Sequence, residues 1–182
     1  ENAASAVAAL EALASQGIDV PAKAMEVGFE RVDWPCRMEV LSRSPLLVAD
    51  GAHNVYSVES LLKSLPKYLE FDRIILIVGF SKDKNVADMA QALGDKADIT
   101  IATASRHPRS VDVAKLASLF KENGKTVLEA LTPADALKIA IGNAGSRDLI
   151  LATGSLFLTA EVRESALGIE PEIYPELTAS GL

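Results

Sequence analysis

The chain has 182 residues, of which 49% are apolar and 24% are charged, and its formal net charge at pH 7 is −7. This length and composition predict one globular domain with a sizeable core. The acidic balance argues against a nucleic-acid partner, and no apolar run approaches the roughly 18 residues of a membrane span, so we expect no membrane association. The one cysteine, Cys36, excludes an internal disulfide and a cysteine-based metal cluster. We therefore expect a reducing, cytoplasmic location.

The chain opens within a predicted helix. Apolar residues recur at helical spacing from Ala4 to Leu13, and Gly17 and Pro21 then end the pattern. Because the chain has no initiator Met and begins inside this element, we expect it to be the C-terminal part of a longer protein.

An alternation of strands and helices follows. Residues 22–35 are irregular or a short helix, and residues 37–43 and 45–50 are predicted as extended segments around a turn at Ser44. The later helices are predicted over residues 55–69, 85–93, 110–120, 132–144 and 155–167, and the strands over residues 73–80, 97–103, 125–130 and 147–155. This order predicts an α/β fold: a doubly wound, mostly parallel sheet with helices on both faces and an antiparallel strand or hairpin at one edge.

In such folds ligands bind beyond the carboxyl ends of the strands. The segments at these ends read ADGAHN, GFSKDKN, TASRHPRS, EALTP and TGS, and polar residues gather in four of the five. The candidate site is therefore expected in these loops.

Familiar catalytic motifs are missing from the sequence. It contains no G-x-x-x-x-G-K-[ST] phosphate loop, no G-x-G-x-x-G and no G-x-S-x-G. Two His and one Cys leave little for a transition-metal site. A free-standing enzyme would be short of parts, and we expect the chain alone to be inactive.

The polar segments allow a structural and a functional interpretation. Asp50 and His53 could end a strand and cap the next helix, or they could bind a ribose and a phosphate or carboxylate. Ser155 could cap the last helix or help to receive an anion at its N-terminus. Arg37 could be an exposed cation at a strand entrance or a nucleotide contact.

Two further loops carry cations. The segment SRHPRS holds Arg106, His107 and Arg109, either as a solvated loop or as a patch that faces an anion. The segment SKDKN, with Lys82 and Lys84, favours a solvated helix start over a ligand site.

Four segments together resemble one family. ENAASAVAALEAL, VDWPCRMEVL, LLVADGAHNVYSVESL and LATGSLFL occur in this order. From residue 1 to about residue 166 the chain resembles the C-terminal domain of folylpolyglutamate synthase and dihydrofolate synthase, which belong to the Mur ligase superfamily of ATP-dependent amide-forming ligases. The DGAHN segment is the most specific part of this resemblance.

The resemblance implies a reaction and its partners. ATP would phosphorylate a carboxylate of folate or dihydropteroate, and the amino group of L-glutamate would attack the acyl phosphate to form an amide. ATP and Mg²⁺ would be held mainly by the chain's own N-terminal ATPase domain, which these residues do not include. Catalysis would rest on positioning and charge stabilisation and would need no side-chain nucleophile.

The resemblance also implies site residues. Asn2, Arg37 and Asp50 would bind the nucleotide, with Asp50 on the ribose side. His53 would lie near the phosphates and the incoming glutamate and would be the catalytic residue. Ser155 would help to hold the glutamate carboxylates, and no metal ligand is implied in this chain.

The sequence departs from the family at several positions. Val55 replaces a Pro that follows DGAHN in many relatives, Cys36 stands where Gly is common, and Phe157 stands where Tyr is common. Arg109 matches a recurrent Pro-Arg, and neither it nor the segment at residues 83–85 receives a role.

We therefore expect a glutamate ligase domain at residues 1–166, a tail at residues 167–182 and a monomer. A non-catalytic α/β binding or interaction module, and a ligase domain for a peptidoglycan precursor, are the alternatives. A phosphate loop encoded upstream of residue 1 would exclude the binding module.

Overall fold

The structure is a computed structural model that describes residues 2–121 and 126–171. Its contacts divide the chain into two units, Glu1–Trp34 and Pro35–Leu182. The first unit holds helices α1 (Asn2–Ala14) and α2 (Ala22–Glu30). Gly17, with φ of +86°, takes the left-handed conformation after α1 that the sequence predicted as a helix stop.

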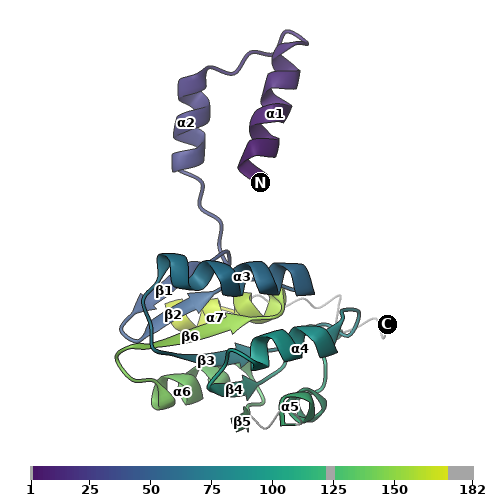
Figure 1. Ribbon diagram of the computed structural model, residues 1–182, viewed down its shortest axis with the longest axis vertical. Helices are drawn as coiled ribbons and strands as arrows, with labels where there is room; N and C mark the ends of the chain where they lie inside the picture. Colours follow the sequence, from purple (N-terminus) through teal and green to yellow (C-terminus); the bar gives the residue numbers. More distant parts are fainter. Residues whose placement is uncertain (1, 122–125, 172–182) are drawn as a thin grey trace. The chain divides into compact units, whose positions relative to one another are not determined.

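The second unit is built on one six-stranded sheet in the order β1-β2-β6-β3-β4-β5 (Figure 1). The strands are β1 (Glu39–Arg43), β2 (Leu46–Ala49), β3 (Arg73–Val78), β4 (Ile99–Ala102), β5 (Thr126–Glu129) and β6 (Asp148–Thr153). β1 runs antiparallel to β2, and every other neighbouring pair is parallel. The predicted mostly parallel sheet with an antiparallel hairpin at one edge is confirmed.

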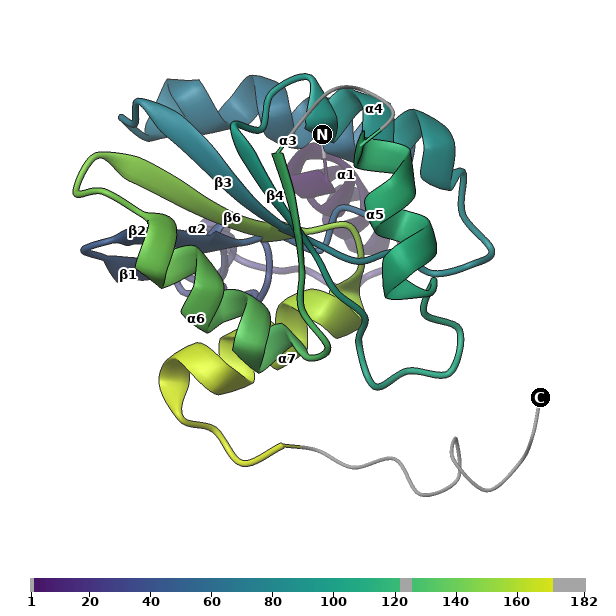
Figure 2. The same ribbon diagram turned by 90° about the horizontal axis from the view of Figure 1, so that it is seen from below.

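Helices cover both faces of this sheet, as predicted (Figure 2). They are α3 (Val55–Tyr68), α4 (Val86–Gly94), α5 (Val113–Lys121), α6 (Pro133–Asn143) and α7 (Leu156–Leu167). The apolar faces of α3, α4 and α5 pack on one side of the strands. Those of α6 and α7 pack on the other. None of the described helices is long and apolar enough to cross a membrane.

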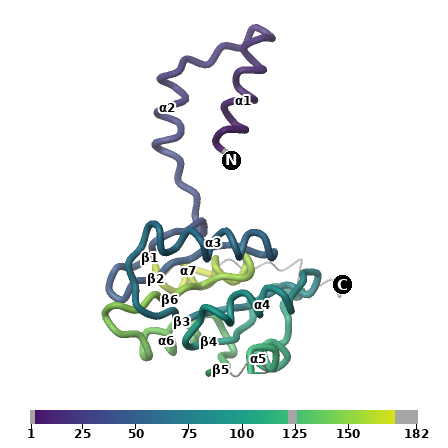
Figure 3. Tube along the Cα trace, viewed as in Figure 1, coloured from purple at the N-terminus to yellow at the C-terminus, as the bar shows by residue number. Residues whose placement is uncertain are grey.

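The chain order brings two distant turns together. β6 returns from α6 into the gap between β2 and β3, as the trace in Figure 3 shows. The segment after β2 therefore lies beside the segment after β6 at the carboxyl edge of the sheet, where the parallel strands end. This is the place where ligands bind in doubly wound folds.

Local signals explain where the helices begin. Asn54 caps α3: its Oδ1 accepts from the Ser57 backbone N–H at 2.8 Å, and the Ser57 hydroxyl accepts from the Asn54 N–H at 3.1 Å. Thr132 caps α6, with Pro133 in the first turn, as the sequence predicted.

The first extended segment is shorter than predicted. β1 begins at Glu39 rather than at Arg37, because Cys36 and Met38 have φ of +58° and +43°, which no strand allows. The turn at Ser44 is present, and its peptide bond to Pro45 is cis. Residues 172–182 of the predicted tail lie outside the described part of the chain. So does residue 125, the first residue of the strand predicted over residues 125–130.

Candidate functional site

Two turns at the carboxyl edge are locked together through Asp50. Its Oδ2 accepts from the Met38 backbone N–H at 2.9 Å, and its Oδ1 accepts from the Ala52 N–H at 2.9 Å. The Gly51 N–H in turn donates to the Cys36 carbonyl at 2.7 Å. The turn at residues 36–38 and the DGAHN segment are therefore held as one unit.

The environment of Asp50 sets its electrostatics. Burial raises the pKa of this carboxyl, and the N–H groups of Met38 and Ala52 and the Arg37 guanidinium oppose that rise. Arg37 is exposed, and its positive charge favours the ionised form of the Asp50 carboxyl. Because each oxygen already accepts one backbone N–H, a ligand would have to use the remaining lone pairs.

His53 stands on the outer side of the same unit. Its side chain is exposed, and its Nδ1 lies 2.8 Å from the Gly51 carbonyl oxygen. A carbonyl can only accept, so Nδ1 carries the proton in this contact. Nε2 is then the ring nitrogen that can meet a ligand.

The end of β6 closes the site from the other side. The Asp50 N–H donates to the Ala152 carbonyl and the Gly154 N–H to the Ala52 carbonyl, both at 3.0 Å. Gly154 has φ of +104°, and a Cβ there would lie 2.6 Å from Phe80 and 2.8 Å from the Gly79 carbonyl oxygen. Only glycine fits this turn.

Ser155 follows at the start of α7. It is buried and stands in the N-cap position, but its side chain makes no capping hydrogen bond. The first hydrogen bond of the helix runs from the Thr159 N–H to the Ser155 carbonyl at 3.0 Å. The earlier N–H groups of α7 thus receive no cap from the Ser155 side chain, an arrangement that suits an anion.

A second pair of loops lies beside this unit. The loops after β3 and β4 are joined by a bridge between Ser81 and Ser110 and by the Lys82 N–H donating to the Arg109 carbonyl at 2.8 Å. The His107 ring stacks on Phe157 of α7 with its centroid 4.1 Å away. The cation-bearing loop is therefore fixed against the start of α7.

Charged groups strengthen that attachment. Glu161 of α7 is buried, which raises its pKa, and its Oε1 accepts from the Arg106 N–H at 2.7 Å. The Arg106 guanidinium also pairs with Glu164 at 2.8 Å. Burial and the Arg109 charge lower the pKa of His107, whose Nδ1 accepts from the Arg109 N–H at 3.1 Å.

The structure brings four of the five site residues predicted from sequence to one place: Arg37, Asp50, His53 and Ser155. Asn2 begins α1 in the other unit, and its side chain lies outside what the structure describes.

Sequence reasoning assigned no role to the acidic residues that hold the site together. Glu39 accepts from the Cys36 N–H at 2.8 Å and from the Arg163 guanidinium. Glu161 could have been found, because it is a carboxylate beside the buried positions Leu158 and Val162 of α7. Nothing in the sequence pattern pointed to Arg163 as the partner of Glu39.

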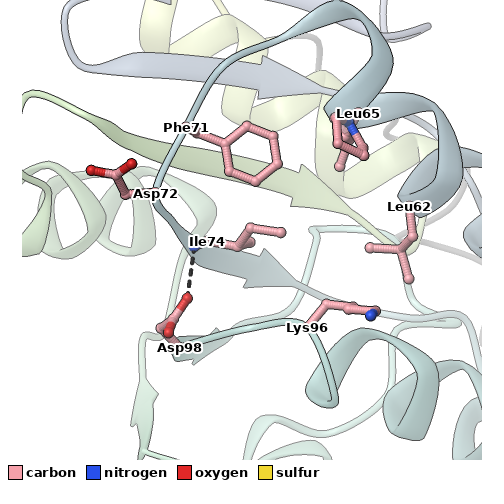
Figure 4. A pocket seen from close by; sticks show the side chains of 8 residues that line it. Leu62, Leu65, Phe71, Asp72, Ile74, Lys96 and Asp98 are labelled. Atoms are coloured by element: carbon pink, nitrogen blue, oxygen red, sulfur yellow. Dashed lines mark hydrogen bonds between the residues drawn. The ribbon is translucent and has the colours of Figure 1, made fainter.

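A pocket of about 260 Å³ lies at the opposite edge of the sheet, where β3 and β4 begin (Figure 4). Both of its carboxylates already have partners: Asp98 accepts from the Ile74 N–H at 2.9 Å, and Asp72 pairs with Arg147 at 2.6 Å. In the described ranges no three His, Cys, Asp or Glu side chains gather as a metal site requires.

Comparison with known proteins decides the family. The family described as "Mur ligase, glutamate ligase domain" matches residues 36–156, which fall within the second unit and contain both joined turns. The chain belongs to the Mur ligase family. The matched range begins at Cys36 and therefore excludes Asn2. It includes the other four predicted site residues of this ligase domain, Arg37, Asp50, His53 and Ser155.

Curated relatives of this Mur ligase domain include folate enzymes. The chain is 34% identical over 84% of its length to a probable bifunctional folylpolyglutamate synthase/dihydropteroate synthase of Halobacterium salinarum, of which it spans 18%. It is 31% identical over 90% of its length to the dihydrofolate synthase/folylpolyglutamate synthase of Escherichia coli, of which it spans 37%.

A solved structure agrees with these relatives. The Escherichia coli FolC structure in complex with DHPP and ADP superposes with a TM-score of 0.80 at 26% identity, covering 92% of this chain and 39% of that one. The chain thus spans well under half the length of the relatives it matches.

Proposed function

We propose that the chain is the glutamate ligase domain of an ATP-dependent enzyme that adds L-glutamate to folate or dihydropteroate. The observation that carries the proposal is the single locked unit at the carboxyl edge, where Arg37, Asp50 and His53 stand beside the start of α7 in a domain of the Mur ligase family. In this proposal ATP supplies the phosphoryl group that activates the acceptor carboxylate. The amino group of glutamate then attacks the carbonyl carbon of the resulting acyl phosphate, and phosphate leaves as the amide forms.

The residues present fit a nucleotide and a dicarboxylate. The exposed Arg37 guanidinium can meet phosphate oxygens, and the remaining lone pairs of Asp50 can accept from ribose hydroxyls. Mg²⁺ would be held outside this chain, because the described residues offer no cluster of ligands for it. Support for ADP binding comes from the FolC relative, whose structure was solved with ADP.

His53 and Ser155 are proposed to serve the incoming amino acid. The exposed Nε2 of His53 can interact with a phosphate oxygen or with the attacking amine. The Ser155 hydroxyl and the uncapped N–H groups of α7 can receive a carboxylate of glutamate. No side chain is required as a nucleophile, so positioning and electrostatic stabilisation would supply the rate enhancement.

The experiment measures steady-state kinetics of the protein that carries this chain together with its ATPase domain. Asp50→Ala should raise the KM for ATP about tenfold, a loss of roughly 1.4 kcal/mol of binding. It should also lower stability, because the N–H groups of Met38 and Ala52 lose their acceptor. His53→Ala should lower kcat by a factor on the order of 100 without destabilising the fold, since the side chain is exposed.

Asp95→Ala is the matched control, because Asp95 is an exposed acid at the far end of α4. It should leave both constants unchanged. Wild-type kinetics for Asp50→Ala and His53→Ala would overturn the site assignment. A cytoplasmic location and a monomeric state remain predictions. Sedimentation of the full-length protein would measure its oligomeric state.

A further inference from the structure

The ion pair between Glu39 and Arg163 ties the first strand of the sheet to the last helix. The Arg163 Nε lies 2.9 Å from Oε1 and 3.0 Å from Oε2 of Glu39. Both side chains are largely shielded, at 21% and 26% exposure. The same Oε2 accepts from the Cys36 backbone N–H at 2.8 Å, so Glu39 fastens α7 and the turn before β1 at once.

That turn has a conformation that its residues do not favour. Cys36 and Met38, on either side of Arg37, are both non-glycine residues with positive φ. Such backbone persists only where the surroundings hold it. Three hydrogen bonds do so here: Cys36 N–H to Glu39, Met38 N–H to Asp50, and Gly51 N–H to the Cys36 carbonyl.

Glu39 is placed as a support rather than as a ligand. Its two carboxylate oxygens accept from Arg163 and Cys36, so it is bonded to the turn whose exposed side chain is Arg37. By contrast, Asp50 keeps its place through backbone N–H groups. Through this ion pair the turn thus depends on Arg163, which lies 124 positions from Glu39 in the sequence.

We propose that Glu39 and Arg163 are positioning residues for Arg37: the pair holds the turn in the strained conformation that presents the guanidinium to the nucleotide, and it couples that presentation to α7, whose N-terminus would receive glutamate. The nucleotide part of this inference rests on the proposed function. The structural part, that the pair fixes the turn, does not.

The first measurement is hydrogen exchange of backbone amides in the 182-residue chain. Glu39→Leu, and independently Arg163→Met, should speed exchange at the amides of Cys36, Met38 and Gly51 by about tenfold or more, since local opening controls such protection. Amides in the middle of β3 should not change. Unchanged exchange at the turn in both variants would overturn the inference; where Glu39→Leu fails to fold, Arg163→Met and Glu39→Gln decide.

The second measurement is kinetics of the protein that includes the ATPase domain. Arg163→Met should raise the KM for ATP about fivefold to tenfold and leave kcat within about twofold, because it removes binding rather than chemistry. Arg163→Lys, which restores a cation opposite Glu39, should recover most of the affinity.

The control is Arg73→Met, which breaks the comparable pair with Asp148 at the opposite edge of the sheet. It should lower the thermal midpoint without changing the KM for ATP. An equal rise in KM for Arg73→Met would show that any loss of stability weakens binding and would overturn the inference. A wild-type enzyme with no glutamate-dependent ATP turnover would instead refute the proposed function, while the exchange data would still decide whether the pair fixes the turn.

Discussion

Replacement of Gly154 by alanine should be among the most damaging single changes at the candidate site. The residue has φ of +104°, and a Cβ would lie 2.6 Å from Cε1 of Phe80 and 2.8 Å from the Gly79 carbonyl oxygen. Phe80 is only 2% exposed, so its ring cannot swing into solvent. The substitution therefore combines an unfavourable backbone conformation with overpacking against a fixed neighbour.

The expected cost follows from these two terms. Strained backbone costs about 1–3 kcal/mol and overpacking costs about as much, so we expect a loss of roughly 3 kcal/mol in the free energy of unfolding. For a chain of this size that corresponds to a fall of roughly 6–12 °C in the thermal midpoint. Circular dichroism of the purified chain during heating measures it.

Gly142→Ala is the matched control, because Gly142 lies in α6 and no neighbouring atom stands within 4 Å of the position that a Cβ would take. The same substitution there should stabilise the chain by roughly 0.5 kcal/mol, since alanine favours the helix. If Gly154→Ala and Gly142→Ala melt at the same temperature, the close packing inferred for the TGS turn is wrong.

Two further predictions concern titratable groups. The hydrogen bonds from Arg73 and from the Gly145 N–H hold the pKa of Asp148 below its usual value. The ionised carboxylate therefore stabilises the folded chain fully at a pH above the usual pKa of Asp. This stabilisation is lost as the pH falls through the lower pKa of the folded state. Asp148→Asn should lower the free energy of unfolding in urea by about 1–2 kcal/mol at pH 7. The difference from wild type should shrink below about pH 4. A constant difference down to about pH 3 would contradict this prediction. Burial raises the pKa of the Cys36 thiol, so iodoacetamide at about pH 8 should alkylate it about tenfold more slowly in the folded chain than in urea, and equal rates would refute its burial.

The fold was predictable because its signals are local. The apolar face of α3, with Val58, Leu61 and Leu65 buried, follows helical spacing directly. The alternation of strands and helices then fixes the parallel sheet, and Asn54 and Thr132 mark helix starts by their side chains. The start of β1 was predicted two residues too early, because the turn before it depends on positive φ at residues that do not favour it.

The sequence predicted where four of the proposed site residues lie in the fold, but not the contacts that hold them; their roles stay predictions. The rule that ligands meet the carboxyl ends of strands places Asp50, His53 and Ser155 at one edge. It does not reveal that Asp50 engages its oxygens with Met38 and Ala52, nor that Glu39 meets Arg163, because those contacts depend on the tertiary fold. Position 36, where the resemblance led us to expect Gly, has a left-handed φ of +58°, a conformation that glycine adopts without steric cost.

Incorporation of labelled L-glutamate by the full-length protein, which we propose carries this chain together with an ATPase domain, tests the ligase assignment most directly. Dihydropteroate, a reduced folate and a UDP-muramyl peptide precursor would be offered separately with ATP and Mg²⁺. We expect ATP-dependent incorporation into at least one of the two pterin acceptors, unchanged by Asp95→Ala and lowered by His53→Ala. Incorporation into the muramyl precursor alone, or no incorporation into any acceptor by a folded protein that binds ATP, would contradict it.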